Sequence, residues 1–220
     1  NPQKQQKSSI RFFQSRRIID GFYIHLVSPD RGIIYYTPIM LFGFIDLFLA
    51  LKNRVRLMPV LVGIIGVNLL LYSMWGDPWG GWAFGSRYLI PSYAILSIFI
   101  ALLLTYWKQK VWFLILFIVV AFYSIAVNTL GAITTSAIPP QVEVLDLEKL
   151  SGLVQKYTFE KSWDFLIAGN SKSFAYQAFL KDYLSPLQFY QILTISIVIF
   201  IGALMVYYVL TTYKKGEKNV

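Results

Sequence analysis

The sequence predicts an all-α polytopic membrane helix bundle with about five transmembrane helices and short external interfacial helices. Composition is the first observation behind this prediction, because hydrophobic residues make up 56% of the 220-residue chain and charged residues only 14%. The mean hydropathy of +0.56 is typical of a protein solvated by lipid rather than of a soluble domain. The second observation is a series of long apolar runs, which charges and turn residues separate.

Each apolar run is compared with the hydrocarbon core of a bilayer, which is ~30 Å thick and needs about 20 helical residues to cross. The predicted spans are Ile33 to Leu51, Leu57 to Trp75, Leu89 to Trp107, Val111 to Ile133 and Phe189 to Leu210. They divide the chain into an external or interfacial segment (1–32), four membrane helices with one external loop (33–133), a second external loop (134–188), a last membrane helix (189–210) and a cytoplasmic tail (211–220).

Lysine and arginine in the short connections predict the orientation of the bundle, because these residues favour the cytoplasmic side. They fall after the first span, after the third and in the tail, at Lys52, Arg54, Arg56, Lys108, Lys110, Lys214, Lys215 and Lys218. In the external loop we expect short helices over 142–157 and 174–184. Residues 10–26 have an amphipathic pattern that fits either a basic interfacial helix or an ordinary loop helix.

The lack of cysteine and the scarcity of histidine limit the chemistry that the chain can perform. It has no cysteine and a single histidine, His25, so a thiolate or histidine metal cluster and a histidine-based triad are not expected. The nearest approach to a phosphate loop, Ala168 to Ser173, lacks the first glycine of the Walker spacing, and ATP-driven chemistry is therefore not predicted. The chain begins Asn1-Pro2 without a signal-peptide pattern, so we expect it to be the C-terminal part of a longer protein.

The segment WGDPWGGWAFGSRYLIP, residues 75–91, is the strongest candidate for function. It lies in the predicted external loop, where Trp79, Trp82 and Tyr88 offer flat apolar faces that suit a sugar ring or a lipid chain. Its four glycines allow close approach of backbone to a ligand. Tryptophan and tyrosine also gather at membrane interfaces as simple anchors, and this interpretation stays open beside ligand binding.

Arg87 is the only basic residue of this loop and is expected at headgroup depth, where a guanidinium can hold a lipid phosphate through two parallel hydrogen bonds. The alternative is a structural arginine paired with Asp77. Asp77 itself could serve as a base, a metal ligand or a turn acid, and the turn acid is the simplest interpretation.

A second motif, SPDRGIIYYTP at 28–38, enters the first span from the same side, so we expect the two motifs to form one site. Asp30 and Arg31 are its candidates for chemistry and for substrate binding. A local turn or a helix cap is the competing interpretation for both residues.

Two polar residues lie inside the predicted spans. We interpret Asp46 as an acid near the cytoplasmic side that reaches Lys52, with a buried functional acid as the alternative. Asn68 is expected to form a hydrogen bond between helices.

The two motifs together resemble the paired SPxRGLxxYSP and WWGGWxxGPRYLxP signatures of bacterial multi-pass glycosyltransferases of the GT-C superfamily, family 39 or protein mannosyltransferase-like. Lys181 to Leu187, KDYLSPL, is similar to the element that precedes the last span in that group. The sequence departs from the signature at Ser86, where proline is usual, and at Gly76-Asp77, which interrupts a tryptophan pair.

This resemblance implies transfer of a sugar from a polyprenyl-phosphate donor at the external face of a bacterial cytoplasmic membrane. Arg87 would hold the donor phosphate, Trp79, Trp82 and Tyr88 would border the sugar or lipid, and the catalytic base would come from upstream. The implied partners are membrane lipid, the lipid-linked donor and the preceding part of the same protein, with no nucleic acid; a divalent metal stays open. The competing class is a noncatalytic membrane scaffold or a lipid-linked-sugar flippase or transporter.

Overall fold

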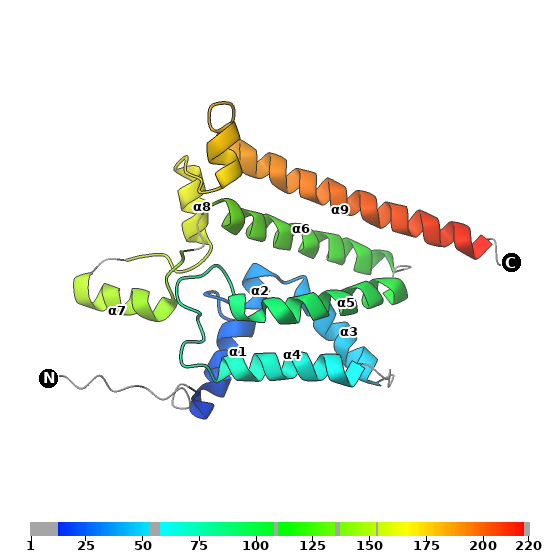
Figure 1. Ribbon diagram of the computed structural model, residues 1–220, viewed down its shortest axis with the longest axis horizontal. Coiled ribbons are helices and arrows are strands. Elements are labelled where there is room, and N and C mark those ends of the chain that lie inside the picture. Colours follow the sequence, from blue (N-terminus) through cyan, green and yellow to red (C-terminus); the bar gives the residue numbers. More distant parts are fainter. Residues whose placement is uncertain (1–12, 53–57, 108–109, 135–136, 153, 218–220) are drawn as a thin grey trace.

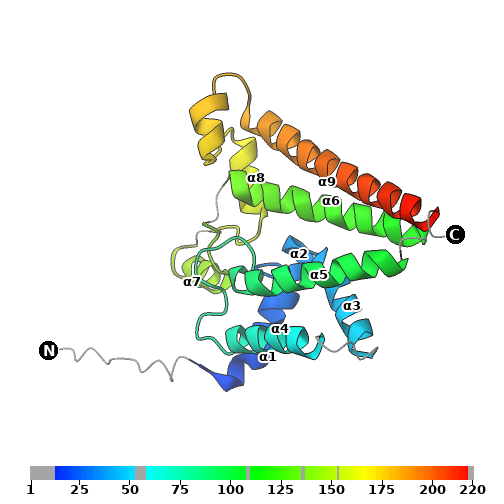
Figure 2. The same cartoon turned by 45° about the vertical axis from the view of Figure 1, so that its right-hand side comes forward.

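The computed structural model describes residues 13–52, 58–107, 110–134, 137–152 and 154–217, and every regular element within these ranges is a helix. The long helices, roughly parallel in Figures 1 and 2, are α4 (Met58–Ser73), α5 (Ile90–Trp107), α6 (Val111–Ile133) and α9 (Pro186–Glu217). We call the end of the bundle at which α4 and α6 end and α5 and α9 begin the loop end. It lies on the left in Figure 1.

Three segments are long and apolar enough to cross a membrane: Arg87–Trp107, Val111–Ile133 and Pro186–Tyr207. They contain 21, 23 and 22 residues, which at 1.5 Å per residue reach the ~30 Å of a hydrocarbon core. They overlap the third, fourth and fifth predicted spans, and the structure thus confirms helices of sufficient length and apolarity at these three places.

The first two predicted spans are not confirmed as such. Residues 33–51 do not form one helix, because α2 (Ile33–Tyr36) ends before Thr37 and α3 (Met40–Lys52) begins after Pro38. Proline lacks an N–H group and disfavours helical backbone at the residue before it, and Thr37 accordingly has φ −145° and ψ 55°. In place of the second span, α4 has 16 residues and is apolar but shorter than a full span; the predicted first residue, Leu57, lies outside the described residues.

Helix α6 supplies the hydrogen bonds that this break requires. Asn128 donates from its side chain to the Tyr36 carbonyl oxygen at 2.8 Å. The Ser124 hydroxyl accepts from the Ile39 backbone N–H at 3.1 Å. Because unpaired backbone groups are costly away from water, these two side chains stabilise an interrupted helix inside an apolar bundle.

Two apolar clusters hold α3, α4, α5 and α6 together. The first joins α3, α4 and α5 through Leu47, Ala50, Ile65, Leu96 and Phe99. The second joins α3, α5 and α6 through Phe42, Leu103, Phe113 and Phe117. Helices α3 and α5 approach closely at Gly43, where a Cβ would lie 2.7 Å from the Leu96 carbonyl oxygen. A larger side chain at that position would force the helices apart.

The two polar residues predicted to lie inside spans, Asn68 and Asp46, have different outcomes. Ser92 of α5 donates to the Asn68 side-chain oxygen of α4 at 2.7 Å, which confirms the expected hydrogen bond between helices. Asp46 is wrongly predicted to reach Lys52, because among the described residues no cation pairs with it. The side chain points into the bundle instead, and its Oδ2 atom is buried without a hydrogen-bond partner in the described part of the chain.

Short helices gather at the loop end. They are η2 (Ser15–Arg17), α1 (Ile18–Leu26), α7 (Gln141–Ser151), α8 (Glu160–Ile167) and the π-helical turn η4 (Tyr176–Leu180). Helices are found within both predicted ranges, 142–157 and 174–184, whereas α8 is not predicted. Leu166 of α8 packs against Leu130 and Ile133 of α6. The loop end therefore holds a structured cap that brings distant parts of the sequence together.

Candidate functional site

Arg31 is the centre of the cap, and its side chain is fully buried. Its Nε donates to the Trp79 carbonyl oxygen at 3.1 Å, and its Nη2 donates to the carbonyl oxygens of Gly81 at 3.1 Å and Ile138 at 2.9 Å. The remaining group, Nη1, donates to Asp30, to its carbonyl oxygen at 2.8 Å and to its carboxylate at 2.5 Å. The prediction that the two motifs meet is thereby confirmed.

These contacts correct the expected role of Arg31. A guanidinium has five N–H donors, and all five have protein acceptors here. Since no donor remains for a ligand and the side chain is sealed from solvent, Arg31 is not a substrate-binding residue in this structure. Its hydrogen bonds instead join three parts of the chain: the tryptophan loop (residues 75–91), Asp30 just before α2, and Ile138 before α7.

Asp30 is likewise committed to the cap. One carboxylate oxygen accepts from Arg31, and the other accepts from the backbone N–H of Gln141, the first residue of α7, at 3.0 Å. Burial raises the pKa of Asp30, and the Arg31 charge and the Gln141 N–H offset part of that rise. Because both oxygens are engaged and the residue is fully buried, Asp30 anchors the N-terminus of α7 and does not meet a substrate as a base.

The tryptophan loop turns sharply between Asp77 and Gly80, where the Gly80 N–H donates to the Asp77 carbonyl oxygen at 3.2 Å. Gly80 and Gly81 have φ of +72° and +64°, which residues with a side chain rarely adopt. A Cβ on Gly80 would lie 3.0 Å from Nε of Arg87. The glycines therefore let the loop backbone lie directly under the Arg87 side chain, while Asp77 belongs to the turn.

Arg87 is exposed, and it is the first residue of the 3-10 turn η3 (Arg87–Leu89), which leads into α5. Its guanidinium carbon lies 5.4 Å from the centroid of the Tyr88 ring. Tyr88 in turn stacks on Tyr72 of α4, with ring centroids 4.3 Å apart and an interplanar angle of 7°. Within the described residues no carboxylate pairs with Arg87, so the alternative pairing with Asp77 is not observed.

The sequence does not predict a buried hydrogen bond between His25 and Ser86, the residue that precedes Arg87. Nδ1 of His25 lies 2.7 Å from the Ser86 hydroxyl oxygen, and both residues are buried. Burial lowers the pKa of His25, and the Tyr72 carbonyl offsets part of this effect. Ser86 stands where the resembled signature has proline, and a hydroxyl at this position can bond the imidazole as proline cannot. The pair fixes the backbone from which Arg87 projects.

Trp82 connects the loop with the external helices. Its indole N–H donates to the Glu143 carboxylate of α7 at 2.6 Å, and the Lys161 ammonium of α8 lies 5.3 Å from its ring centroid. These contacts engage the N–H and place a cation over the ring, although 52% of the residue remains exposed. The three predicted aromatic residues therefore have different surroundings. Tyr88 lies beside Arg87, and Trp82 contacts α7 and α8. Trp79 belongs to the turn between Asp77 and Gly80, and its carbonyl oxygen accepts from Arg31.

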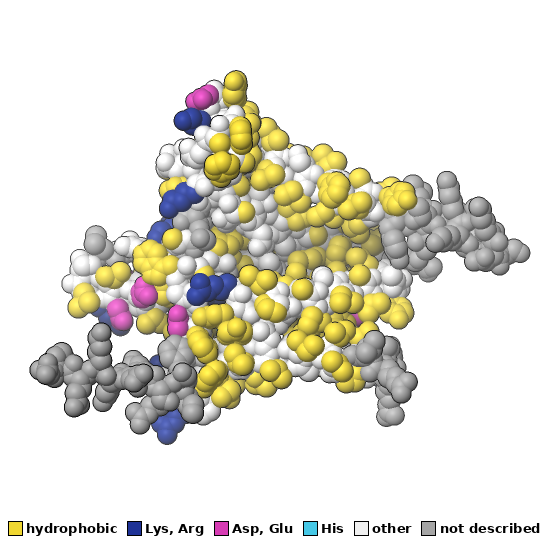
Figure 3. All heavy atoms as spheres, in the orientation of Figure 1, with side chains coloured by type: hydrophobic (Ala, Val, Ile, Leu, Met, Phe, Trp, Pro, Cys, Tyr) yellow, Lys and Arg dark blue, Asp and Glu magenta, His cyan; other side chains and the backbone are white. Residues whose placement is uncertain are grey.

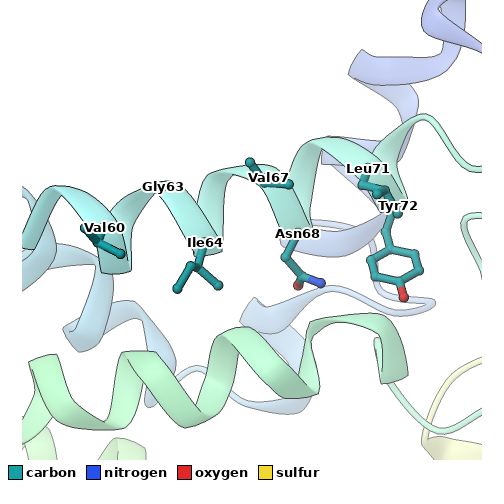
Figure 4. A pocket seen from close by; sticks show the side chains of 7 residues that line it. All are labelled: Val60, Gly63, Ile64, Val67, Asn68, Leu71 and Tyr72. Carbon is teal, nitrogen blue, oxygen red and sulfur yellow. The ribbon is translucent and has the colours of Figure 1, made fainter.

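An apolar groove runs along α4 toward this cluster (Figure 4). Its volume is about 490 Å³, and it is lined by Val60, Gly63, Ile64, Val67, Asn68, Leu71 and Tyr72. We call it the α4 groove. Figure 4 shows Ile64, Asn68 and Tyr72 on the side of α4 that faces the neighbouring helix. Tyr72 lines the groove and stacks on Tyr88, whose ring lies next to the Arg87 guanidinium, so two tyrosine rings link the groove to Arg87.

Fold and composition together define a helical membrane protein whose polar residues are organised at one end of its bundle. Comparison of the chain with protein-family models, curated proteins and solved structures finds no match. The described residues hold no group of three or more His, Asp or Glu that could bind a metal ion.

Proposed function

We propose that this chain is the C-terminal membrane part of a polyprenyl-phosphate-sugar-dependent glycosyltransferase that acts at the external face of a bacterial cytoplasmic membrane. The observation that carries the proposal is that Arg87 is exposed, has no ion-pair partner among the described residues and is linked to the α4 groove through the rings of Tyr88 and Tyr72. The resemblance of the two sequence motifs to the GT-C signatures supports the same reaction class.

The chemistry of the surface matches the two halves of a lipid phosphate. The α4 groove offers apolar side chains along an apolar helix, which suits a prenyl chain. Arg87 offers the planar fork of donors that phosphate oxygens accept in pairs. The Tyr72–Tyr88 stack connects the two, and its rings would border the sugar or the headgroup of the lipid.

The acid or base of the reaction is proposed to lie in another part of the protein. Asp30 is enclosed by Arg31 and α7, and Asp77 belongs to a tight turn. Neither arrangement suits proton transfer at the Arg87 surface. The chain alone should therefore bind the donor without transferring its sugar.

Asp46 favours a second candidate function, a lipid-linked-sugar transporter. Buried carboxyl groups inside membrane helices often mark transport pathways, and Asp46 has an unpartnered oxygen among the described residues. It is 3% exposed, lies on α3 and does not line the α4 groove. We therefore favour chemistry on a lipid headgroup at the loop end.

Binding of a polyprenyl phosphate to the chain in lipid nanodiscs tests the proposal. Hydrogen bonds to charged groups contribute about 1.5 to 3 kcal/mol, so Arg87→Ala should weaken binding about 10- to 150-fold. Arg87→Lys keeps the charge but loses the fork and should give an intermediate loss. Lys52→Ala, an exposed cation at the opposite end of the bundle, is the control. Equal affinities of wild type and Arg87→Ala would refute the site, and an Asp46→Asn variant that alone abolishes translocation of the lipid would favour the transporter.

A further inference from the structure

Three strongly exposed aromatic side chains stand on the segment just before α9. Phe174, Phe179 and Tyr183 have 79%, 69% and 82% of their surface exposed. Large aromatic residues exposed as a group need a reason, because each forfeits the free energy of burial. We call residues 173–184 the anchor segment; it is independent of Arg87 and of the proposed function.

The anchor segment holds its aromatic side chains in a defined arrangement. Phe179 belongs to the wide π-helical turn η4, Phe174 lies two residues before this turn, and their rings meet edge to face with centroids 6.3 Å apart. Tyr176, in contrast, is buried, and its hydroxyl donates to the Leu184 carbonyl oxygen at 2.9 Å. Gln177 donates from its side chain to the Ser171 carbonyl oxygen at 2.6 Å. These hydrogen bonds hold the segment in its own fold, and the Tyr176 ring packs on Phe189 of α9 with centroids 5.5 Å apart, while Phe174 and Phe179 stay exposed together.

The position of the segment identifies what covers these rings. It leads directly into α9, which begins at Pro186, and only 6% of the spanning window of α9 is buried inside the protein. The surface next to the segment is therefore a surface that lipid would cover. In Figure 3, at the top of the molecule, hydrophobic side chains lie toward α9, and the charged side chains lie on the side away from it. Lys172, Lys181 and Asp182 are all exposed.

We propose that the anchor segment lies in the bilayer interface, with Phe174, Phe179 and Tyr183 inserted among the headgroups and upper acyl chains. Aromatic rings are stable at this depth because their apolar bodies leave water while polar groups stay near it. Lys172 and Lys181 face lipid phosphates at the same level. The partner of this surface is the lipid leaflet at the loop end, and the segment fixes the depth and tilt at which α9 enters the membrane.

The natural lack of cysteine makes a direct test clean, because single cysteine variants carry one spin label each. Phe179→Cys, Tyr183→Cys and, as the matched control on the same segment, Asp182→Cys are labelled with a nitroxide. The whole chain is placed in vesicles of zwitterionic and anionic phospholipid. Collision rates are measured with oxygen, which concentrates in lipid, and with a water-soluble nickel chelate.

The proposal expects labels at 179 and 183 to collide severalfold more with oxygen than with nickel, and the label at 182 to show the reverse preference. Nickel preference at 179 and 183 would place the rings in water and overturn the proposal. Protection of these labels from both reagents would show a protein cover and would also overturn it. Oxygen preference at all three positions would indicate immersion rather than an interfacial position and would equally refute it.

Discussion

Replacement of Arg31 by methionine tests the organisation of the cap most severely. Methionine fills similar space but donates no hydrogen bond, so the carboxylate of Asp30 stays buried without its charged partner. Breaking a buried ion pair in this way costs about 3 to 5 kcal/mol. The carbonyl oxygens of Trp79 and Gly81 lose this donor as well, and that of Ile138 keeps only the Ala83 N–H. We therefore expect the unfolding free energy of Arg31→Met to fall by at least this amount.

Thermal unfolding in detergent, followed by tryptophan fluorescence, is the assay. For domains of roughly this size 1 kcal/mol shifts Tm by about 2 to 4 °C, so the expected decrease is about 6 to 20 °C. Three of the six tryptophans, Trp75, Trp79 and Trp82, lie in the loop that Arg31 holds, so about half of the signal reports on this loop.

A second substitution separates the loss of charge pairing from a general loss of packing. Asp30→Asn combined with Arg31→Met removes the orphaned charge and should recover at least about 1 kcal/mol of the single variant's loss. A Tm for Arg31→Met within 2 °C of wild type, or a double variant no more stable than the single one, would refute the assigned role of Arg31.

Two further predictions concern the surroundings of Arg87. Burial lowers the pKa of His25 from 6.5, so the unfolded chain binds the proton more tightly; stability should be full above pH 6.5 and decrease as the pH falls toward the folded pKa. When the pH is lowered from 7.5 to 5, the Tm of His25→Gln should decrease less than the Tm of wild type. An equal decrease in the two proteins would contradict this. Gly80→Ala should cost roughly 1 to 2 kcal/mol at its φ of +72° and should weaken polyprenyl-phosphate binding by displacing Arg87. Gly66→Ala, where a Cβ meets nothing within 4 Å, is the matched control, and equal binding and Tm in both glycine variants would contradict the expected contact.

The parts of the fold that the sequence predicts correctly are those that apolar length alone determines. Helices α5 and α6 are continuous apolar runs, and the structure confirms that both are long and apolar enough to cross a membrane. The first predicted span fails because hydropathy does not register the missing N–H of Pro38 or its effect on Thr37. The side chains that compensate for this break, Ser124 and Asn128, come from a helix far along the chain.

The candidate site shows the same division. The glycine turn and the single exposed cation Arg87 are visible in one short segment, and the structure brings them together. The role of Arg31 cannot be predicted from the sequence, because its acceptors include backbone carbonyl oxygens as far along the chain as residue 138. Every residue has such an oxygen, so no residue type indicates the contact. His25 and Ser86 are separated by 61 residues, so only the fold reveals that they pair.

The central claim is that Arg87 and the α4 groove together form one binding site for a lipid phosphate. Photocrosslinking with a polyprenyl phosphate that carries a photoreactive group in its chain measures this directly, with peptide mapping of the labelled site. We expect labelling of α4 between Val60 and Tyr72, and at least a tenfold loss of that labelling in Arg87→Ala but not in Lys52→Ala. Labelling confined to α9, or labelling of α4 that Arg87→Ala leaves unchanged, would contradict it.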